Sequence, residues 1–166
     1  MIKTFAAFSA IFLAASTHVV AQVPRPSGAT GVSKPNDVVF ARRILMSGIS
    51  RNMDEILGII ETPGDFDLPG AREHAYEIST MLLSFPHLFP PGTDTWSKAF
   101  ENDDAGRVSF AKSEVWLTFD DFYDRAQGAS QTALDASLAK RADQFRRLTL
   151  DLKQKCDACH AKYRRY

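Results

Sequence analysis

Residues 155–166 read KCDACHAKYRRY, and this last stretch holds the two cysteines of the sequence, Cys156 and Cys159, with His160 directly after the second. Residues three apart on an α-helix lie on the same side, so a helix here would turn both thiols toward one neighbour. A disulfide between the two would close a very short loop and would constrain the unfolded chain very little. The spacing therefore needs an explanation other than a structural disulfide.

The five residues from Cys156 to His160 form the C-x-x-C-H pattern of c-type haem attachment. Both thiols can reach the two vinyl groups on one edge of the porphyrin, and the adjacent imidazole can offer a neutral nitrogen to the iron. We therefore expect one covalent haem c, attached through Cys156 and Cys159, with His160 as an axial ligand of the iron.

Two other uses of the motif stay open. A zinc site would need further ligands, and beyond the N-terminal segment the only other histidines are His74 and His87. A thioredoxin-like redox pair would stand at the start of a helix that follows a strand, whereas no strand is predicted upstream of Cys156. Both alternatives fit the sequence less well than haem attachment.

Apolar residues recur at three- and four-residue steps in four stretches, which predicts four amphipathic helices. The first should begin with Ser33 as its N-cap and end near Glu61. The second should begin at Leu68-Pro69 and end before Pro86. The predicted buried positions of these two helices are Val39, Met46, Ile49, Met53, Ile56 and Ile60, and Ala71, Ala75, Ile78, Leu82 and Phe85.

A long connection with Pro90-Pro91-Gly92, and a helical turn expected near residues 96–100, should lead to the third helix. That helix should begin near Ser113-Glu114, and its turn to the fourth should lie near residues 135–140, where no Gly or Pro marks it. No stretch alternates with a period of two, so we expect an all-α protein, an antiparallel four-helix bundle with covalent haem c. The predicted buried positions of the last two helices are Val115, Phe119, Phe122 and Ala126, and Phe145, Leu148, Leu152, Cys156, Cys159 and Tyr163.

The N-terminal residues 1–21 have the features of an export signal. Lys3 precedes an apolar run that is too short to span a bilayer, and Val19-Val20-Ala21 forms a small-residue cleavage site. Residues 22–33 are predicted to be a flexible leader and residues 34–166 to form the bundle. We therefore expect a periplasmic protein with no membrane anchor after signal cleavage.

The charge is balanced overall but uneven along the chain. With 20 Lys and Arg against 20 Asp and Glu, the sequence gives no reason to expect a nucleic-acid partner. Residues 140–166, however, carry nine Lys and Arg against three Asp. This basic end could dock an acidic redox partner protein or could be an ordinary solvated helix end, and both readings stay open. The residues expected to form the docking face are Lys153, Lys155, Lys162, Arg164 and Arg165.

Four stretches together resemble the class II cytochromes c, the family of cytochrome c-prime and its low-spin relatives. They are ARRILMSGISRNM at 41–53, FPHLFPPGT at 85–93, KSEVWLTFDDF at 112–122 and CDACHAKYR at 156–164. The resemblance implies a four-helix bundle with the haem motif near its C-terminal end, and a homodimer formed through the first two helices. The sequence departs from the family in the segment between the last two helices, which is longer than usual and lacks the glycine often found there.

The resemblance also implies which residues face the iron. Arg42, Met46 and Met53 reproduce the family's spacing in the first helix, so Met46 is the expected sixth ligand and Arg42 is expected to reach a haem propionate. The implied function is one-electron transfer through a His/Met-ligated low-spin iron, by an electron carrier and not an enzyme. The alternative is a five-coordinate cytochrome c-prime that binds small gases, NO or CO, at an open distal site.

Overall fold

The computed structural model describes residues 34–62, 66–96 and 108–165 of the chain. Its elements in chain order are α1 (Pro35–Glu61), α2 (Leu68–Ser84), the 3-10 helix η1 (Phe85–Leu88), α3 (Glu114–Leu117), α4 (Phe119–Ser137) and α5 (Ala142–Tyr163). Within the described residues the only β-structure is an isolated antiparallel bridge between Ala111 and Arg164. The prediction of an all-α bundle of four long helices is therefore confirmed.

Some of the sequence predictions fall outside the described residues. These are the signal peptide and leader at residues 1–33 and most of the helical turn expected at residues 96–100. Among the described residues, no helix is both long enough and apolar enough to cross a membrane.

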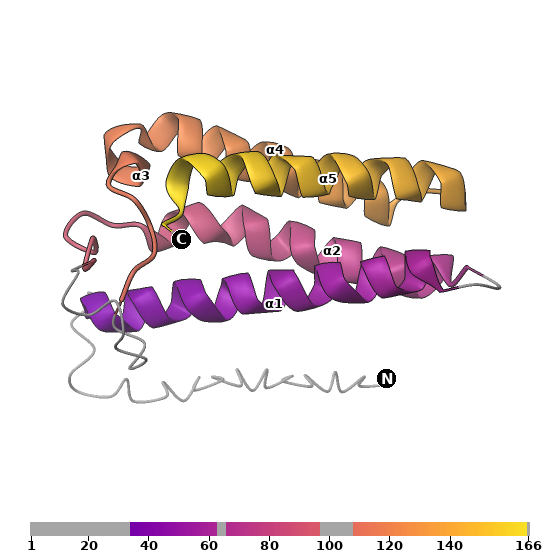
Figure 1. The fold of residues 1–166 in the computed structure, drawn as a ribbon, viewed down its shortest axis with the longest axis horizontal. Coiled ribbons are helices and arrows are strands. Elements are labelled where there is room, and N and C mark those ends of the chain that lie inside the picture. The colour runs from indigo at the N-terminus through magenta and orange to yellow at the C-terminus, as the bar shows by residue number, and fades with distance from the viewer. Residues whose placement is uncertain (1–33, 63–65, 97–107, 166) are drawn as a thin grey trace, which may run out of the picture. The chain divides into compact units, whose positions relative to one another are not determined.

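The four long helices run in alternating directions (Figure 1). α1 packs against α2, α2 against α4, and α4 against α5, whereas α1 and α5 do not pack closely against each other. One end of the bundle consequently gathers the start of α1, the end of α2, the start of α4 and the end of α5 (Figure 1). This topology brings Met46 and the cysteine motif, which are more than a hundred residues apart in sequence, to the same end.

The starts of the first two helices use different chemistry. The N-cap of α1 is Lys34, in an extended conformation and without a side-chain hydrogen bond, so the predicted cap at Ser33 is wrong by one residue. Pro35 at the first helical position makes this possible, because its fixed φ favours the helix without a cap. α2 has a true cap, since Asp67 accepts a hydrogen bond of 3.0 Å from the backbone nitrogen of Gly70. A Cβ at position 70 would clash with Asp67 Oδ2, so a larger residue there would displace the capping carboxylate.

The third predicted helix is broken into α3 and α4. Thr118 leaves helical geometry at φ −129° and ψ 50°, and its hydroxyl donates to the carbonyl of Glu114 at 2.9 Å. The expectation of one continuous helix from Ser113 is therefore wrong at this residue. The same hydroxyl lies 3.0 Å from the Tyr163 hydroxyl, so the break faces the end of α5.

The turn between α4 and α5, at residues 138–141, needs no glycine. Leu138 ends α4 at φ −96°, and none of the described residues other than Gly92 has a positive φ. Arg72 of α2 donates from Nε to the carbonyl of Ser137 at 2.5 Å, which satisfies one of the open carbonyls at the end of α4. Gln144 accepts from the Lys140 backbone nitrogen at 3.2 Å at the start of α5. Side chains thus replace the glycine that the family often uses in this turn.

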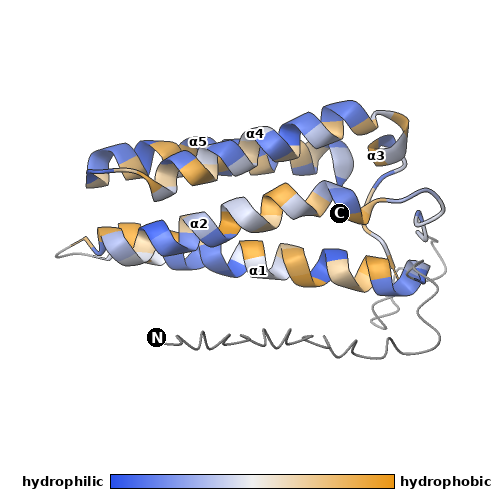
Figure 2. Cartoon of the chain, turned by 180° about the vertical axis from the view of Figure 1, so that it is seen from behind, coloured by the Kyte–Doolittle hydropathy of each residue, from blue (hydrophilic) through white to orange (hydrophobic). Residues whose placement is uncertain are grey.

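The buried residues form two clusters. The main cluster runs along the bundle and draws many alanines from α2 and α4, which allows these helices to approach closely. The aromatic cluster lies where η1, α3, α4 and the end of α5 meet. Hydrophobic residues recur along the helices in the pattern that these clusters require (Figure 2). The main cluster is Ile49, Ile56, Ala71, Ala75, Ile78, Leu82, Ala129, Ala133, Ala136, Ala139, Phe145 and Leu152, and the aromatic cluster is Phe85, Phe89, Val115, Phe122 and Tyr163.

Candidate functional site

The two cysteines lie on α5, one turn apart, at the boundary between the two clusters. Both are free thiols and both are half-buried. Cys156 packs against the main cluster, whereas Cys159 packs against the aromatic cluster. The motif therefore turns one sulfur toward each part of the core.

Burial makes both thiols poor nucleophiles. It is the first cause that raises the pKa of Cys156, to about 11, and it also raises the pKa of Cys159. A thioredoxin-like pair requires the opposite, a lowered pKa that produces a thiolate. Among the described residues, no three His, Cys, Asp or Glu side chains are grouped so that they could hold a metal ion by themselves. The redox-pair and zinc alternatives both lose support.

His160 is half-buried beside the cysteines. Burial lowers the pKa of its imidazole, and the positive charge of Arg164 lowers it further. Both effects favour the neutral form of the ring, which is the form that ligates iron. Two half-buried thiols and a neutral imidazole on one turn of helix are the donor set that covalent haem attachment uses, so the residues present fit the group.

Met46 occupies a special position on α1. Its half-buried side chain packs against both the main and the aromatic cluster, and no other partly buried hydrophobic residue among those described does so. Met53, one heptad later, packs against the main cluster alone. Met46 on α1 and the cysteines on α5 therefore lie at the same boundary of the core, on two helices that are not packed directly together.

The family model for Cytochrome C' matches residues 37–164 of the chain. The chain belongs to this family. Covalent haem c is the cofactor that the family carries, and family members are haem carriers and not typically enzymes. They are usually periplasmic.

Individual relatives agree with this assignment. The chain is 29% identical over 128 residues to cytochrome c-556 of Agrobacterium tumefaciens (strain II Chrys), which covers 76% of the chain and 95% of the relative. Cytochrome c' from Thermochromatium tepidum has 23% identity and a TM-score of 0.68 over 81% of this chain and 98% of that one. A nitrosyl complex of a variant of cytochrome c prime from Alcaligenes xylosoxidans has 20% identity and a TM-score of 0.67, over 81% and 98%. The two solved structures support the fold.

The buried guanidinium of Arg42 ties α1 to the connection that follows α2. Only 5% of Arg42 is exposed. Its Nε donates to the Leu88 carbonyl at 2.6 Å, and Nη1 donates to the Thr93 carbonyl at 3.1 Å and to Ser109 Oγ at 3.3 Å. Nη2 donates to the Thr93 hydroxyl. This anchoring role was not visible in the sequence, because the acceptors, two backbone carbonyls and two hydroxyls, lie far along the chain.

The environment of Arg42 is aromatic as well as polar. The guanidinium carbon lies 4.0 Å from the centre of the Phe89 ring and 5.4 Å from that of Trp116. Burial lowers the pKa of Arg42 to about 10, against the opposing effect of Asp94. Contact between Arg42 and a haem propionate stays a prediction. In the structure, each of the three guanidinium nitrogens already donates to an acceptor of the protein.

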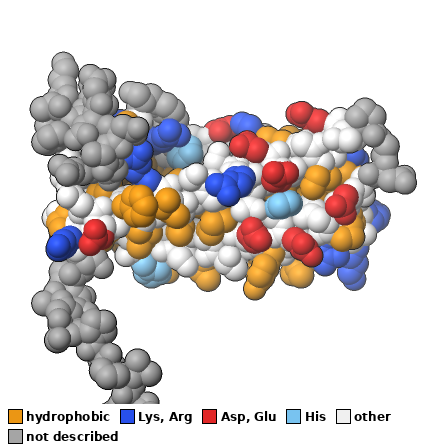
Figure 3. Space-filling view, turned by 90° about the horizontal axis from the view of Figure 1, so that it is seen from below, with side chains coloured by type: hydrophobic (Ala, Val, Ile, Leu, Met, Phe, Trp, Pro, Cys, Tyr) orange, Lys and Arg blue, Asp and Glu red, His pale blue; other side chains and the backbone are white. Residues whose placement is uncertain are grey.

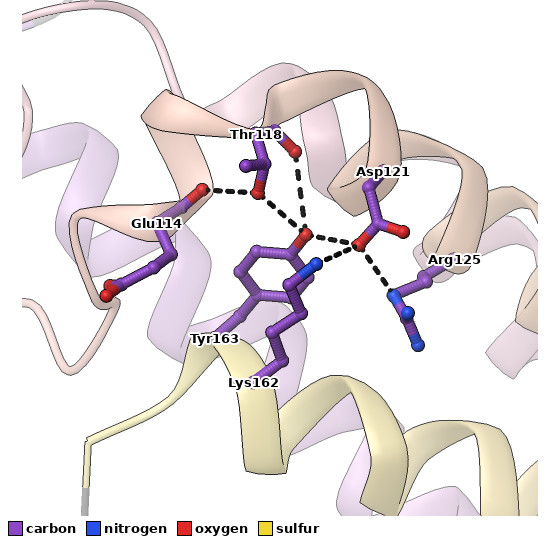
Figure 4. Close-up of polar contacts among 6 residues, drawn as sticks. All are labelled: Glu114, Thr118, Asp121, Arg125, Lys162 and Tyr163. Carbon is purple, nitrogen blue, oxygen red and sulfur yellow. Dashed lines mark hydrogen bonds and ion pairs between the residues drawn. The ribbon is translucent and has the colours of Figure 1, made fainter.

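At the end of α5, Asp121 of α4 gathers three donors on one carboxylate oxygen (Figure 4). Its Oδ2 accepts from Tyr163 Oη at 2.5 Å, from Arg125 Nε at 2.7 Å and from Lys162 Nζ at 2.9 Å. Arg125 first, and then Tyr163 and Lys162, hold the pKa of this carboxyl well below its usual range. This group was not predicted from the sequence, although the four-residue spacing of Asp121 and Arg125 indicates an ion pair on a helix.

The basic end of the chain is largely paired. Lys153 bonds Asp157 at 2.7 Å, Lys155 bonds Asp151 at 2.8 Å and Lys162 bonds Asp121. Three of the five cations expected on a docking face thus have a carboxylate beside them. Attraction of an acidic partner stays a prediction. Because these carboxylates offset part of the positive charge, the local electrostatic field is weaker than the number of basic residues indicates.

Proposed function

We propose that this protein is a periplasmic electron carrier whose single haem c is attached through Cys156 and Cys159 and ligated by His160 and Met46. The observation that carries the proposal is the position of Met46. It packs against both clusters of the core, one of which contacts Cys156 and the other Cys159. A side chain at that boundary on α1 stands opposite the helix that bears the imidazole.

Each residue contributes a separate property. When bound, haem c supplies an iron that exchanges one electron with a redox partner. The neutral imidazole of His160 and the thioether of Met46 would both bind the iron without adding charge, and a thioether favours the reduced form. The apolar side chains of the two clusters would limit the access of water to the haem, and a drier site strengthens the effect of nearby charges.

Gas binding is the second candidate function. It is supported by the solved structure of the Alcaligenes xylosoxidans relative, which is a nitrosyl complex. In that case Met46 would cover an open position and would move aside for NO or CO. The two functions differ in one property, which is whether a protein side chain occupies the sixth position.

Carbon monoxide tests this difference in the purified holoprotein. We expect a low-spin spectrum in both oxidation states and little change when CO is added to the reduced protein. Met46→Ala should become high-spin and bind CO readily. Met53→Ala is the matched control, because it removes a methionine from the same helix but should keep the low-spin spectrum. A high-spin reduced wild-type protein that binds CO at once would favour the gas-binding function.

A homodimer through α1 and α2 remains part of the proposal. Hydrophobic side chains gather on the face of the molecule that α1 lines (Figure 3). The exposed apolar residues of these two helices are Phe40, Ile44, Tyr76 and Leu83. Sedimentation equilibrium of wild-type protein and of Ile44→Glu tests this, with Leu150→Glu on α5 as the control. The variant at position 44 should be a monomer, and a dimer that survives it would remove this face as the interface.

A further inference from the structure

The residues Asp121, Arg125, Lys162 and Tyr163 form a group that we call the Asp121 clasp (Figure 4). It joins the first turns of α4 to the last turn of α5 through one carboxylate oxygen. Thr118 completes it, since its hydroxyl lies 3.0 Å from that of Tyr163. The clasp therefore consists of one anion, two cations and a phenol, with defined geometry between two helices.

The clasp adjoins the site of haem attachment. Tyr163 stands one helical turn after Cys159, and both side chains pack in the aromatic cluster, where the Tyr163 ring is 5.2 Å from that of Phe122. Tyr163 bonds Asp121, and Asp121 in turn bonds Arg125. These bonds link two charged groups of α4 to the turn of α5 that carries the second attachment point.

Further bonds hold the same end of α5 in place. The Lys112 backbone nitrogen donates to the Tyr163 carbonyl at 2.8 Å, and the Arg165 nitrogen donates to the Phe110 carbonyl at 2.8 Å. Lys112 Nζ also reaches the Ala161 carbonyl at 3.1 Å. The chain that follows His160 is thus tied to residues 110–125, which holds the charges of the clasp close to the last turn of α5.

We propose that the Asp121 clasp sets the reduction potential of the haem site, with Asp121 stabilising the oxidised form and Arg125 stabilising the reduced form. A fixed negative charge favours the iron in its more positive state, and a fixed positive charge favours the opposite. The side chains of Asp121 and Arg125 are 42% and 39% exposed, so solvent screens part of each effect. The inference rests on the proposed redox role of the site, but it does not depend on which residue is the sixth ligand.

The chain contains a matched control for this pair. Asp143 and Arg147 on α5 form the same four-residue ion pair at 2.9 Å. Asp143 and Arg147 lie sixteen and twelve residues before Cys159 on this helix, distances of about 24 Å and about 18 Å along its axis. Both distances exceed about two Debye lengths at physiological ionic strength, so this pair should have less influence on the iron than the clasp.

The test is a spectroelectrochemical titration of the holoprotein at low and at high salt. We expect Asp121→Asn to raise the midpoint potential and Arg125→Gln to lower it, and both shifts should shrink as salt is added. Asp143→Asn and Arg147→Gln should leave the midpoint close to that of the wild type. If the two charges act on the haem, the midpoint potentials of the two clasp variants shift in opposite directions. A general loosening of the site would shift both midpoint potentials in the same direction.

Two results would overturn the inference. One is a pair of clasp variants whose midpoints shift no more than those of the control pair, and the other is a pair that shifts in the same direction. Absorption spectra of the same samples report the sixth ligand independently. A wrong assignment of Met46 would therefore appear in the spectra, and a wrong assignment of the clasp would appear in the potentials.

Discussion

Two polar anchors hold the haem end of the bundle, and they are built in opposite ways. Arg42 is a buried cation that donates to neutral oxygens and lies over aromatic rings. Asp121 is a half-exposed anion that accepts from two cations and a phenol. Buried polar contacts are costly to break because the abandoned partners lie away from water, whereas exposed ion pairs contribute little to stability. The first anchor should therefore govern stability, and the second should act mainly through its charge.

The largest expected effect comes from removing the buried anchor. Arg42→Ala leaves the Leu88 and Thr93 carbonyls without their donor and removes the contact with Phe89. We expect the free energy of unfolding of the holoprotein to fall by about 3 kcal/mol, measured by chemical denaturation. Arg51→Ala, an exposed arginine on the same helix, should leave it almost unchanged. Equal effects of the two variants would contradict the anchoring role of Arg42.

A smaller effect is expected from the phenol of the second anchor. Tyr163→Phe keeps the buried ring but removes the hydroxyl that donates to Asp121. The free energy of unfolding should fall by about 1 kcal/mol, the usual value of one hydrogen bond. Tyr76→Phe on the exposed side of α2 serves as the control. A loss as large as that of Arg42→Ala would erase the contrast between the two anchors.

The smallest expected effect is the contribution of Asp121 to the pH dependence of the free energy of unfolding. Its pKa is held below the usual range by Arg125, Tyr163 and Lys162, so the carboxylate binds a proton less readily in the folded than in the unfolded protein. The stability that this gives is fully present above the unfolded pKa of about 3.9 and is lost as the pH falls further. Stability measured between about pH 5 and pH 2 should fall less steeply in Asp121→Asn than in the wild type. An Asp121→Asn protein whose stability falls with the same slope as that of the wild type would remove the effect.

The sequence predicted the helices well, because their apolar periodicity is a local property. All five positions predicted to be buried around α2 are buried, from Ala71 to Phe85. The break at Thr118 was missed, because it is stabilised by a bond to Tyr163, which is far away in sequence. The turn after Ser137 was placed only approximately, since the side chain that stabilises it is Arg72 from another helix.

The residues of the candidate site also fall into two groups, those that a local sequence pattern predicts and those that only the fold brings together. The cysteines and His160 were found at once because five adjacent residues carry the signal. The partners of Arg42 lie 46 to 67 positions away, and those of Asp121 across the clasp lie 41 and 42 positions away. No local pattern predicts such pairs, so only the folded chain reveals which charges surround the attachment site.

The position of Met46 opposite His160 is the central claim, and the sulfur-to-iron charge-transfer absorption of the oxidised holoprotein tests it most directly. The account predicts that this band is present in the wild type and in Met53→Ala and absent in Met46→Ala. A band that persists in Met46→Ala, or a wild-type protein that lacks it and has a high-spin spectrum, would contradict the claim.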